Sequence, residues 1–461
     1  MAWSAPSFAA SVLMAMAGAV GACGAPSSHD AADSGAVDAA PSSPSVSGIV
    51  PSRVFLARTT QVTLSGFATH WSDSTKVDFG PGITIEQLVA ASPTALVAQV
   101  TTAKSTPIGV RDVFVDDGSS RERYAGAFEV ASPVSASFEG TMAQGALARM
   151  TLQVLDTSTP LDLTSVHNID GTITYPNLAL TLPSGVGNLG VNAVQDFEVT
   201  FVVSIDVDAP AATGAVDLVS GAAGATTEFP LPSGVRVTTR TASPLASGIA
   251  ATGQITSAYD SALYAFTPST MAILDFSVES MGLTQDPAVA LLPSSGHFAD
   301  LLGFGYLQTT VAPARAPLYA VYWENTGGTG PYSVTATSTD VAATAAATPA
   351  DQTSQGALAV SALPFVLTGG DHAKNSFDWV KLTLAAPTTL RVQTTGDLAT
   401  DTRVTAYQSD AQTVAAPPIE TGSAADGTFS LKAAGMYYVE FSQGEDYAPP
   451  HTTYTAIIRL D

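Results

Sequence analysis

The chain has 461 residues, of which 40 are Asp or Glu and only 17 are Lys or Arg, giving a formal net charge of −23. This balance disfavours nucleic acid and anionic lipid surfaces as direct partners, because binding to either depends on Lys and Arg. Cys23 is the only cysteine, which excludes an internal disulfide framework. The length suggests about three domains. The few charged residues and the many Thr, Ser, Val, Gly and Pro indicate short strands joined by turns.

The first segment in chain order is an apolar stretch that ends at Cys23. Residues 8–22 are apolar or small, a run too short for a membrane span, which needs about 20 residues, but suited to a signal peptide. The residues Val20-Gly21-Ala22-Cys23 resemble the lipobox of bacterial lipoproteins, although residues 1–7 carry no Lys or Arg. The resemblance implies a signal peptide over residues 1–22 and lipidation of Cys23. The alternative is a short buried helix with a core cysteine.

Residues 23–46 are rich in Ser, Ala, Pro and Asp and contain almost no bulky apolar side chain. Such a composition cannot offset the entropy lost on ordering, so we expect a disordered tether with a mean reach of about 25 to 30 Å. A lipid anchor followed by a tether predicts an extracytoplasmic, membrane-anchored lipoprotein. By analogy with enteric bacteria, Gly24 after the cysteine, rather than an aspartate, favours the outer membrane or the cell surface.

Strand patterns begin after the tether. Short runs of β-branched and aromatic residues, bounded by Gly, Pro, Asp or Ser, occur at 54–57, 61–65, 76–80, 95–100 and 110–115. Strands at this spacing predict a β-sandwich. Pro51, Gly66, the Val77-Asp78-Phe79-Gly80 turn and Gly109 resemble, in that order, the IPT/TIG family of immunoglobulin-like domains. The resemblance covers residues 47–130 and implies an immunoglobulin-like fold there.

The next region, residues 131–245, has strand-like runs at 135–139, 148–155, 171–175, 197–205 and 235–239. These predict a second β-sandwich of unknown family. The Leu-, Pro- and Gly-rich stretch from Leu178 to Val191 predicts an ordered loop. Within it, residues 185–190 match the dinucleotide fingerprint. They open no helix, so a Gly-rich loop is favoured over nucleotide binding.

The last 200 residues contain an internal repeat. The segment from Tyr264 aligns without gaps with the segment from Val380, and the segment from Leu318 aligns with the one from Met436. The alignment predicts two copies of one β-sandwich, over residues 246–340 and 356–461. The Ala-, Thr- and Pro-rich residues 341–355 between them are predicted to be a linker.

Each copy resembles a pre-peptidase C-terminal (PPC) domain. In the first copy the resemblance rests on Asp260, the Tyr264-Ala-Phe266 strand, the Leu318-Tyr-Ala-Val321 strand and Gly330-Pro-Tyr332. The second copy matches at residues 377–382 and 436–439, but it has Thr452-Thr-Tyr454 where the family has Gly-x-Tyr. The resemblance implies jelly-roll-like β-sandwiches of the kind carried as accessory modules by secreted proteins, often proteases. The overall fold class predicted is therefore all-β, with tandem sandwiches.

Motifs for catalysis are poorly represented. The six histidines show no zinc-binding spacing. These histidines are His29, His70, His167, His297, His372 and His451. No Gly-x-Ser-x-Gly nucleophile elbow occurs. With Cys23 assigned to lipidation, no cysteine nucleophile is expected. We therefore expect no catalytic, cofactor-binding or metal residues. His167 is the leading candidate for acid–base catalysis if residues 131–245 contain the active site of a hydrolase.

Two carboxylate pairs leave calcium open as a ligand. Asp206 with Asp208, and Asp116 with Asp117, place oxygen ligands close together in expected loops, whereas turn chemistry explains the Asp117-Gly118 pair equally well.

Three tryptophans leave two interpretations open. A carbohydrate platform is one reading of Trp71, Trp323 and Trp379, but core packing is favoured because the last two fall within apolar strands.

The function predicted from these features is that of a non-enzymatic, envelope-anchored lipoprotein that acts as a spacer or as a binding surface for protein or glycan. Two alternatives stay open. One is an accessory factor that holds a secreted enzyme or export system at the envelope. The other is a hydrolase with its active site in residues 131–245. Fold resemblance alone does not identify the ligand.

Overall fold

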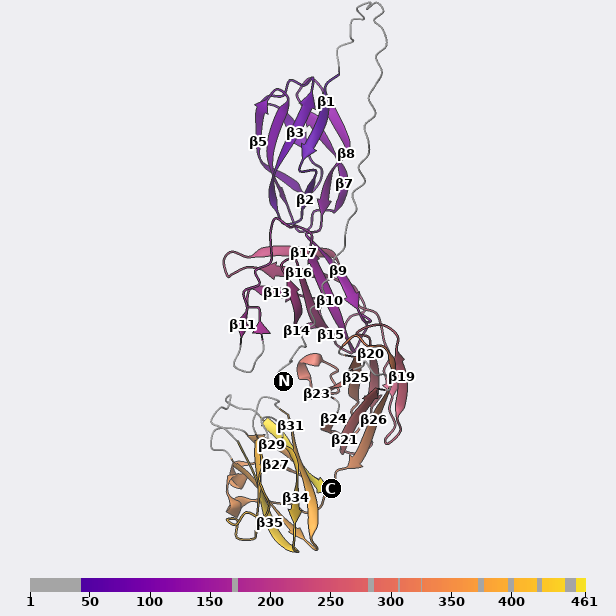
Figure 1. Ribbon diagram of the computed structural model, residues 1–461, viewed down its shortest axis with the longest axis vertical. Coiled ribbons are helices and arrows are strands. Elements are labelled where there is room, and N and C mark those ends of the chain that lie inside the picture. The colour runs from indigo at the N-terminus through magenta and orange to yellow at the C-terminus, as the bar shows by residue number, and fades with distance from the viewer. Residues whose placement is uncertain are drawn as a thin grey trace, which may run out of the picture. The chain divides into compact units, whose positions relative to one another are not determined.

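The computed structural model describes residues 43–167, 173–280, 286–305, 307–324, 326–371, 377–396, 402–420, 425–443 and 453–461 (Figure 1). The described part of the chain is all-β, with 61% of its residues in strands and 3% in helices, which confirms the predicted fold class. None of the helices in these ranges is long and apolar enough to span a membrane. The predicted signal peptide, Cys23 and the tether up to residue 42 lie outside the described residues.

The described residues form two compact units. The first contains the described residues up to Ser135 together with those of Val154–Ala179 and Asp217–Pro232. The second contains Ala136–Gln153, Leu180–Val216 and Ser233–Asp461.

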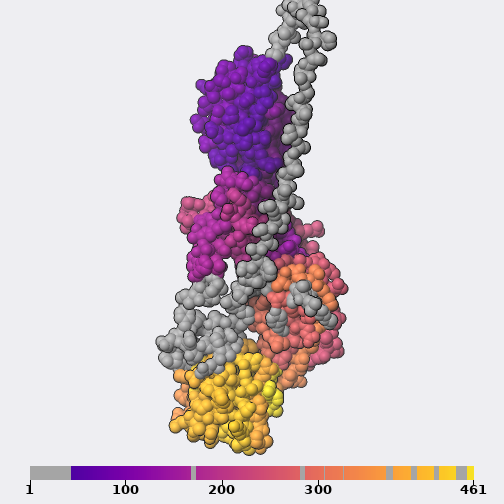
Figure 2. Space-filling view, in the orientation of Figure 1, coloured from indigo at the N-terminus to yellow at the C-terminus, as the bar shows by residue number. Residues whose placement is uncertain are grey.

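The N-terminal sandwich contains eight strands in two sheets of order β1-β3-β6-β5 and β2-β8-β7-β4 (Figure 1). The strands are β1 (Ser45–Val50), β2 (Arg53–Phe55), β3 (Thr59–Phe67), β4 (Lys76–Asp78), β5 (Ile83–Ser92), β6 (Ala95–Thr102), β7 (Gly109–Asp116) and β8 (Arg121–Ala131). Alternate residues point inward, and the Phe79 and Phe128 rings meet in the core with centroids 4.8 Å apart. Its atoms form one continuous indigo body in Figure 2.

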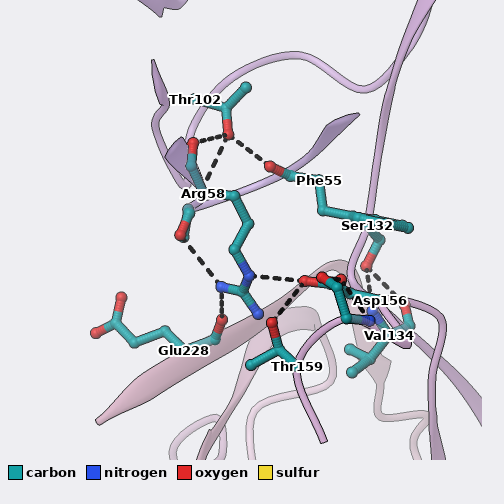
Figure 3. Close-up of polar contacts among 10 residues, drawn as sticks. Phe55, Arg58, Thr102, Ser132, Val134, Asp156, Thr159 and Glu228 are labelled. Carbon is teal, nitrogen blue, oxygen red and sulfur yellow. Dashed lines mark hydrogen bonds and ion pairs between the residues drawn. The ribbon is translucent and has the colours of Figure 1, made fainter. Parts of the chain in front are cut away.

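Arg58, between β2 and β3, joins this sandwich to residues 154–179 and 217–232 of the same unit (Figure 3). Its Nε donates to Asp156 Oδ2 over 2.8 Å, and its Nη1 donates to the Glu228 carbonyl over 2.6 Å. The guanidinium carbon lies 4.8 Å from the centre of the Phe229 ring. Both charged side chains are largely buried, with exposures of 13% for Arg58 and 4% for Asp156. Burial alone raises the pKa of Asp156, but hydrogen bonds from Ser158 and Arg58 outweigh it and lower that pKa.

The middle segment forms the sheets β14-β15-β10-β9 and β13-β16-β17 and the pair β11-β12. Its strands are β9 (Val134–Glu139), β10 (Ala146–Val154), β11 (Val166–His167), β12 (Ile173–Thr174), β13 (Leu178–Thr181), β14 (Val186–Gln195), β15 (Glu198–Ile205), β16 (Thr213–Ser220) and β17 (Thr227–Arg236).

The loop predicted from Leu178 to Val191 is wrong, because β13 and most of β14 occupy these residues. β14 pairs antiparallel with β15, and its register shifts around Gly190, where the glycine has φ +148°. Gly185 makes the preceding turn with φ +73°, and a Cβ there would lie 2.7 Å from that of Ala209. The glycines therefore serve a tight turn and a β-bulge.

The first repeat runs from β18 to β26. Its elements are β18 (Ser243–Pro244), β19 (Ala251–Ile255), β20 (Ser261–Phe266), β21 (Ala272–Ser280), β22 (Pro287–Leu292), η1 (Phe298–Asp300), β23 (Gly303–Gly305), β24 (Leu307–Ala312), β25 (Leu318–Glu324) and β26 (Gly330–Asp340). The sheet orders are β18-β20-β25-β22-β23 and β19-β26-β21-β24.

The second repeat runs from β27 to β36. Its elements are β27 (Ala343–Ala346), η2 (Pro349–Gln352), η3 (Ser354–Gly356), β28 (Leu358–Ala359), β29 (Phe365–Asp371), β30 (Phe377–Leu384), β31 (Thr388–Gly396), β32 (Thr402–Tyr407), β33 (Ile419–Glu420), β34 (Asp426–Leu431), β35 (Gly435–Gln443) and β36 (Thr453–Leu460). The sheet orders are β28-β30-β35-β32-β33 and β27-β29-β36-β31-β34.

The two repeats correspond strand for strand, which confirms the internal repeat found in the sequence. The order β18-β20-β25-β22-β23 matches β28-β30-β35-β32-β33, and β19-β26-β21-β24 matches β29-β36-β31-β34. The second repeat adds β27 at a sheet edge, parallel to β29. The predicted linker therefore differs from the structure: residues 343–346 belong to a sheet, and η2 follows with a capping box made by Thr348 and Asp351.

The strand pairing also corrects the alignment by one residue. Phe266 and Leu382 are aligned in the ungapped match that starts at Tyr264 and Val380. Phe266 lies opposite Leu318, whereas Leu382 lies opposite Tyr437. Leu318 therefore corresponds to Tyr437 and not to Met436. Because side chains alternate along a strand, this shift changes which residues point outward.

The two repeats pack together through their corresponding sheets. Ile273 of β21 contacts Val366 and Ile457 of the second repeat in a small buried cluster. Beside it, Arg459 of β36 donates two hydrogen bonds to Asp275 of β21, with nitrogen–oxygen distances of 2.5 and 3.0 Å. This arrangement leaves each repeat with one further outer sheet face.

Candidate functional site

The outer face of β18-β20-β25-β22-β23 in the first repeat is an internal contact surface. Five of its outward-facing side chains are apolar and at most 3% exposed: Leu263, Ala290, Leu292, Val321 and Trp323. Tyr319 on the same face is partly buried beside them. They pack in one buried cluster with Leu147 of β10 and Val202 of β15. This face is therefore buried against β10 and β15.

The strand registers identify the corresponding positions of the second repeat. Leu263 lies opposite Val321 and Leu292 opposite Tyr319, just as Trp379 lies opposite Glu440 and Tyr407 opposite Tyr438. We define the aromatic face by its six outward-pointing residues, which are Trp379, Lys381, Arg403, Tyr407, Tyr438 and Glu440. All six are partly or fully exposed.

Strand alternation places these side chains outward. In β30, Val380, Leu382 and Leu384 enter the core of the second repeat, so Trp379 and Lys381 point to the other side. In the same way Val439 is buried in β35 between Tyr438 and Glu440. The outward positions are thus fixed by the burial of their neighbours.

The three rings form one cluster across β30, β35 and β32. The Trp379 ring stacks on Tyr407 with centroids 5.3 Å apart and an angle of 27° between the planes. It meets Tyr438 edge-on, with centroids 6.4 Å apart. Because each ring is held by another, the cluster presents preformed apolar surface.

Glu440 sets the electrostatics of the aromatic face. Burial raises its pKa, while hydrogen bonds from Tyr407 and Ser442 and the charge of Arg403 partly oppose the rise. Burial, followed by the charge of Glu440, raises the pKa of Tyr407. A carboxylate fixed among rings and two cations can accept hydrogen bonds beside an apolar surface. This arrangement suits a ligand with both apolar faces and hydroxyl groups.

The tryptophans divide between core and surface. Trp71 and Trp323 are 3% and 1% exposed, which confirms the prediction of core packing for both. For Trp379 that prediction is wrong, because the residue is partly exposed on the outer face of its sheet. Period-two alternation with Val380 and Leu382 was a signal in the sequence for this position. Tyr407 and Tyr438 were not predicted, because only the sheet brings them beside Trp379.

The Asp116 and Asp117 carboxylates serve their own turn. Asp116 Oδ1 accepts the Gly118 N–H over 2.9 Å, and Asp117 Oδ1 accepts the N–H groups of Ser119 and Ser120 over 2.8 and 2.7 Å. Hydrogen bonds from Ser119 and Ser120 lower the pKa of Asp117 to about 2. Turn chemistry accounts for this pair.

Asp206 and Asp208, by contrast, lie beside a histidine that the sequence did not connect with them. His297 Nε2 is 3.2 Å from Asp208 Oδ1, and ligand atoms of all three residues lie within 4.8 Å of one another. Among the described residues, these three form the one group of at least three His, Cys, Asp or Glu side chains that lie close enough to share a metal ion. The hydrogen bond with Asp208 raises the pKa of His297.

The other predicted candidates are not assembled with these groups. His70 is exposed in a loop of the N-terminal sandwich, and His167 is exposed in the two-residue strand β11. Cys23, His29, His372 and His451 lie outside the described residues.

Residues 43–124 match the family model of quinohemoprotein amine dehydrogenase, alpha subunit domain III. The match coincides with the N-terminal sandwich and supports an immunoglobulin-like β-sandwich there. No curated protein matches the chain. The IPT/TIG and PPC resemblances stay predictions.

Several solved structures show a distant likeness. The surface glycan-binding protein PbSGBP-B from Prevotella bryantii is 10% identical, with 91% of this chain and 98% of that chain covered and a TM-score of 0.22. A structure with xylogluco-oligosaccharide is 10% identical over 65% of this chain and 80% of that chain, at a TM-score of 0.18. The ICAM-5 D1-D4 ectodomain fragment is 10% identical over 85% and 91%, at 0.16. At TM-scores this low, nothing about a ligand of this chain follows from them.

Proposed function

We propose that this chain is a non-enzymatic, lipid-anchored envelope protein that binds carbohydrate through the aromatic face. The observation that carries the proposal is the contrast between two corresponding surfaces. The outer face of the first repeat is largely apolar and buried, whereas its counterpart carries three rings, two cations and a carboxylate, all of them partly or fully exposed. A cluster of partly exposed rings among hydrogen-bonding groups is typical of an interaction site.

Carbohydrate is the ligand class that best fits this mixture. A sugar ring has an apolar C–H face that packs on aromatic rings, and hydroxyl groups at its edge that exchange hydrogen bonds. Trp379 and Tyr438 supply the first kind of surface, while Lys381, Arg403 and Glu440 supply donors and an acceptor at its border. The side chains extend over three neighbouring strands, so an extended oligosaccharide chain fits better than a small buried metabolite.

The remaining modules serve as spacers. Arg58 and Asp156 fix the N-terminal sandwich to the next residues of its unit, and Asp275 with Arg459 fixes one repeat to the other. Between β15 and the first repeat, Leu147 and Val202 complete a buried apolar cluster. Contacts of this kind link neighbouring modules of one unit to each other. A lipid on Cys23 then ties the chain to the membrane.

Native affinity gels with a panel of neutral and acidic soluble polysaccharides test the binding function. We expect retardation in at least one gel, and an affinity about tenfold or more weaker for Trp379→Ala. Phe67→Ala, which removes an aromatic residue 58% exposed in the N-terminal sandwich, is the matched control and should bind normally. Unchanged binding by Trp379→Ala excludes the aromatic face.

Membrane fractionation with radiolabelled fatty acid tests the anchor separately. The full chain should carry the label and sediment with membranes, and Cys23→Ser should do neither. A Cys23→Ser variant that keeps its label and stays with membranes contradicts lipidation of Cys23.

A further inference from the structure

The loops that bear Asp206, Asp208 and His297 come from two different parts of the second unit. Asp206 and Asp208 directly follow β15, and His297 lies between β22 and η1. Val207 N–H donates to the Gly296 carbonyl over 3.0 Å, which brings the loops into direct backbone contact. A Cβ on Gly296 would lie 2.6 Å from the Val207 side chain, so the glycine is required for this approach.

The three side chains already have much of the geometry of a metal site. A tetrahedral ion with bonds of about 2.0 to 2.1 Å separates its ligand atoms by about 3.3 Å. His297 Nε2 and Asp208 Oδ1 are 3.2 Å apart, and an oxygen of Asp206 lies within 4.8 Å of both. The Asp206 carboxylate is also held in position by the backbone, because its Oδ1 accepts a hydrogen bond from the Phe298 N–H over 2.9 Å.

Asp300 occupies the position of an outer partner of the histidine. Its Oδ2 is 3.8 Å from His297 Nδ1, on the side of the ring opposite the two other carboxylates. Ser295 Oγ donates to the same oxygen of Asp300 over 2.9 Å. Histidines that bind metal through one nitrogen usually donate the other N–H to a carboxylate, which fixes the tautomer and the ring orientation.

We propose that Asp206, Asp208 and His297 bind one divalent transition-metal ion, such as Zn²⁺, which fastens the loop after β15 to the loop between β22 and η1. One imidazole nitrogen and two carboxylates form the donor set, and water completes the coordination. The histidine favours such an ion over Ca²⁺, which prefers oxygen ligands throughout. In the sequence, the carboxylates alone left calcium open at Asp206 and Asp208.

A divalent cation also suits the charge of this site. The His297 ring lies beside three carboxylates, those of Asp206, Asp208 and Asp300. A cation of charge +2 compensates the negative charge of such a cluster.

Isothermal titration of the purified full chain with ZnCl₂ at slightly alkaline pH, repeated on matched variants, tests the site. We expect His297→Ala to bind one zinc ion fewer than the parent, and Asp208→Asn to bind that ion about tenfold or more weakly. Asp300→Asn should weaken it about tenfold through the orientation of the ring. His70→Ala removes an exposed histidine elsewhere and should leave the stoichiometry unchanged.

Two further measurements make the outcome decisive. Co²⁺ in place of zinc should give a visible spectrum with nitrogen and oxygen ligation that is lost in His297→Ala. Zinc should raise the melting temperature of the parent more than calcium does at equal concentration. Equal zinc stoichiometry and affinity in the parent, His297→Ala and Asp208→Asn overturns the proposal, as does an effect of calcium that matches that of zinc.

Discussion

Trp379 occupies in the second repeat the position that Leu263 occupies in the first. Leu263 is 3% exposed and packs in the cluster that includes Leu147 and Val202, whereas Trp379 is partly exposed and stacks on Tyr407. The same place in one fold is thus a contact between modules in one copy and an open surface in the other. This difference separates the structural role of the first repeat from the binding role proposed for the second.

Truncation of Trp323 should mainly reduce stability, whereas truncation of Trp379 should mainly reduce binding. Trp323→Ala removes a fully buried side chain and should lower the free energy of unfolding by about 3 to 5 kcal/mol. Trp379→Ala should lower it by about 1 kcal/mol or less, because the side chain is partly in contact with water, while polysaccharide affinity falls about tenfold or more. Urea unfolding followed by circular dichroism measures both. A large loss of stability in Trp379→Ala would mean that the ring acts as core.

Removal of Arg58 should destabilise the first unit strongly. Arg58→Met leaves the carboxylate of Asp156 buried without its charged partner, which typically costs about 3 to 5 kcal/mol. Arg53→Met is the control, because the Arg53–Glu129 ion pair lies on the surface, with side-chain exposures of 59% and 34%, and should contribute about 1 kcal/mol or less. Equal effects of the two substitutions would contradict a structural role for the buried pair.

Acid should unfold the first unit partly through Asp156. Its pKa is lowered in the folded chain from an ordinary value of 3.8, so its contribution to stability is present above that value. The contribution is lost as pH falls through the lower, folded pKa. Asp156→Asn should therefore flatten the dependence of stability on pH in this acidic range, as measured by urea unfolding at a series of pH values.

The protonation of His297 should depend on Asp208 in the metal-free chain. The raised pKa means that the stability gained from its carboxylate contacts is present below the ordinary value of 6.5 and is lost as pH rises through the higher, folded pKa. Asp208→Asn removes the largest cause, so the NMR titration midpoint of the His297 ring should fall. A midpoint that does not move would show that the ring and this carboxylate are not in contact in solution.

Gly145 should tolerate no side chain. It has φ +63°, and a Cβ there would lie 2.6 Å from Leu263 Cδ2 and so intrude on the buried cluster. Gly145→Ala should cost about 1 to 3 kcal/mol through backbone strain and overpacking. Gly48→Ala in β1, where no atom lies within 4 Å of the added Cβ, should be close to neutral. Thermal unfolding of both variants checks the difference.

Much of the fold follows from local pattern. The strands predicted at 54–57, 61–65, 95–100 and 110–115 overlap β2, β3, β6 and β7 of the N-terminal sandwich. Alternating apolar residues and turn-forming residues reveal such strands because both signals are contained within a few neighbouring residues. The stretch 178–191 was misassigned because glycine in a bulged strand produces the same composition as glycine in a loop.

The all-β class and the internal repeat follow from the order of the residues, because alternation and self-similarity are properties of the chain alone. Three features depend on the folded chain: the one-residue correction at Tyr437, the outward position of the aromatic face and the meeting of Asp208 with His297. The physical reason is that side chains alternate along a strand with a period of two. This alternation assigns each residue to one of two faces, but it does not determine which face packs against another layer. That choice is made by contacts between residues far apart in sequence, and here it leaves one face of the second repeat open.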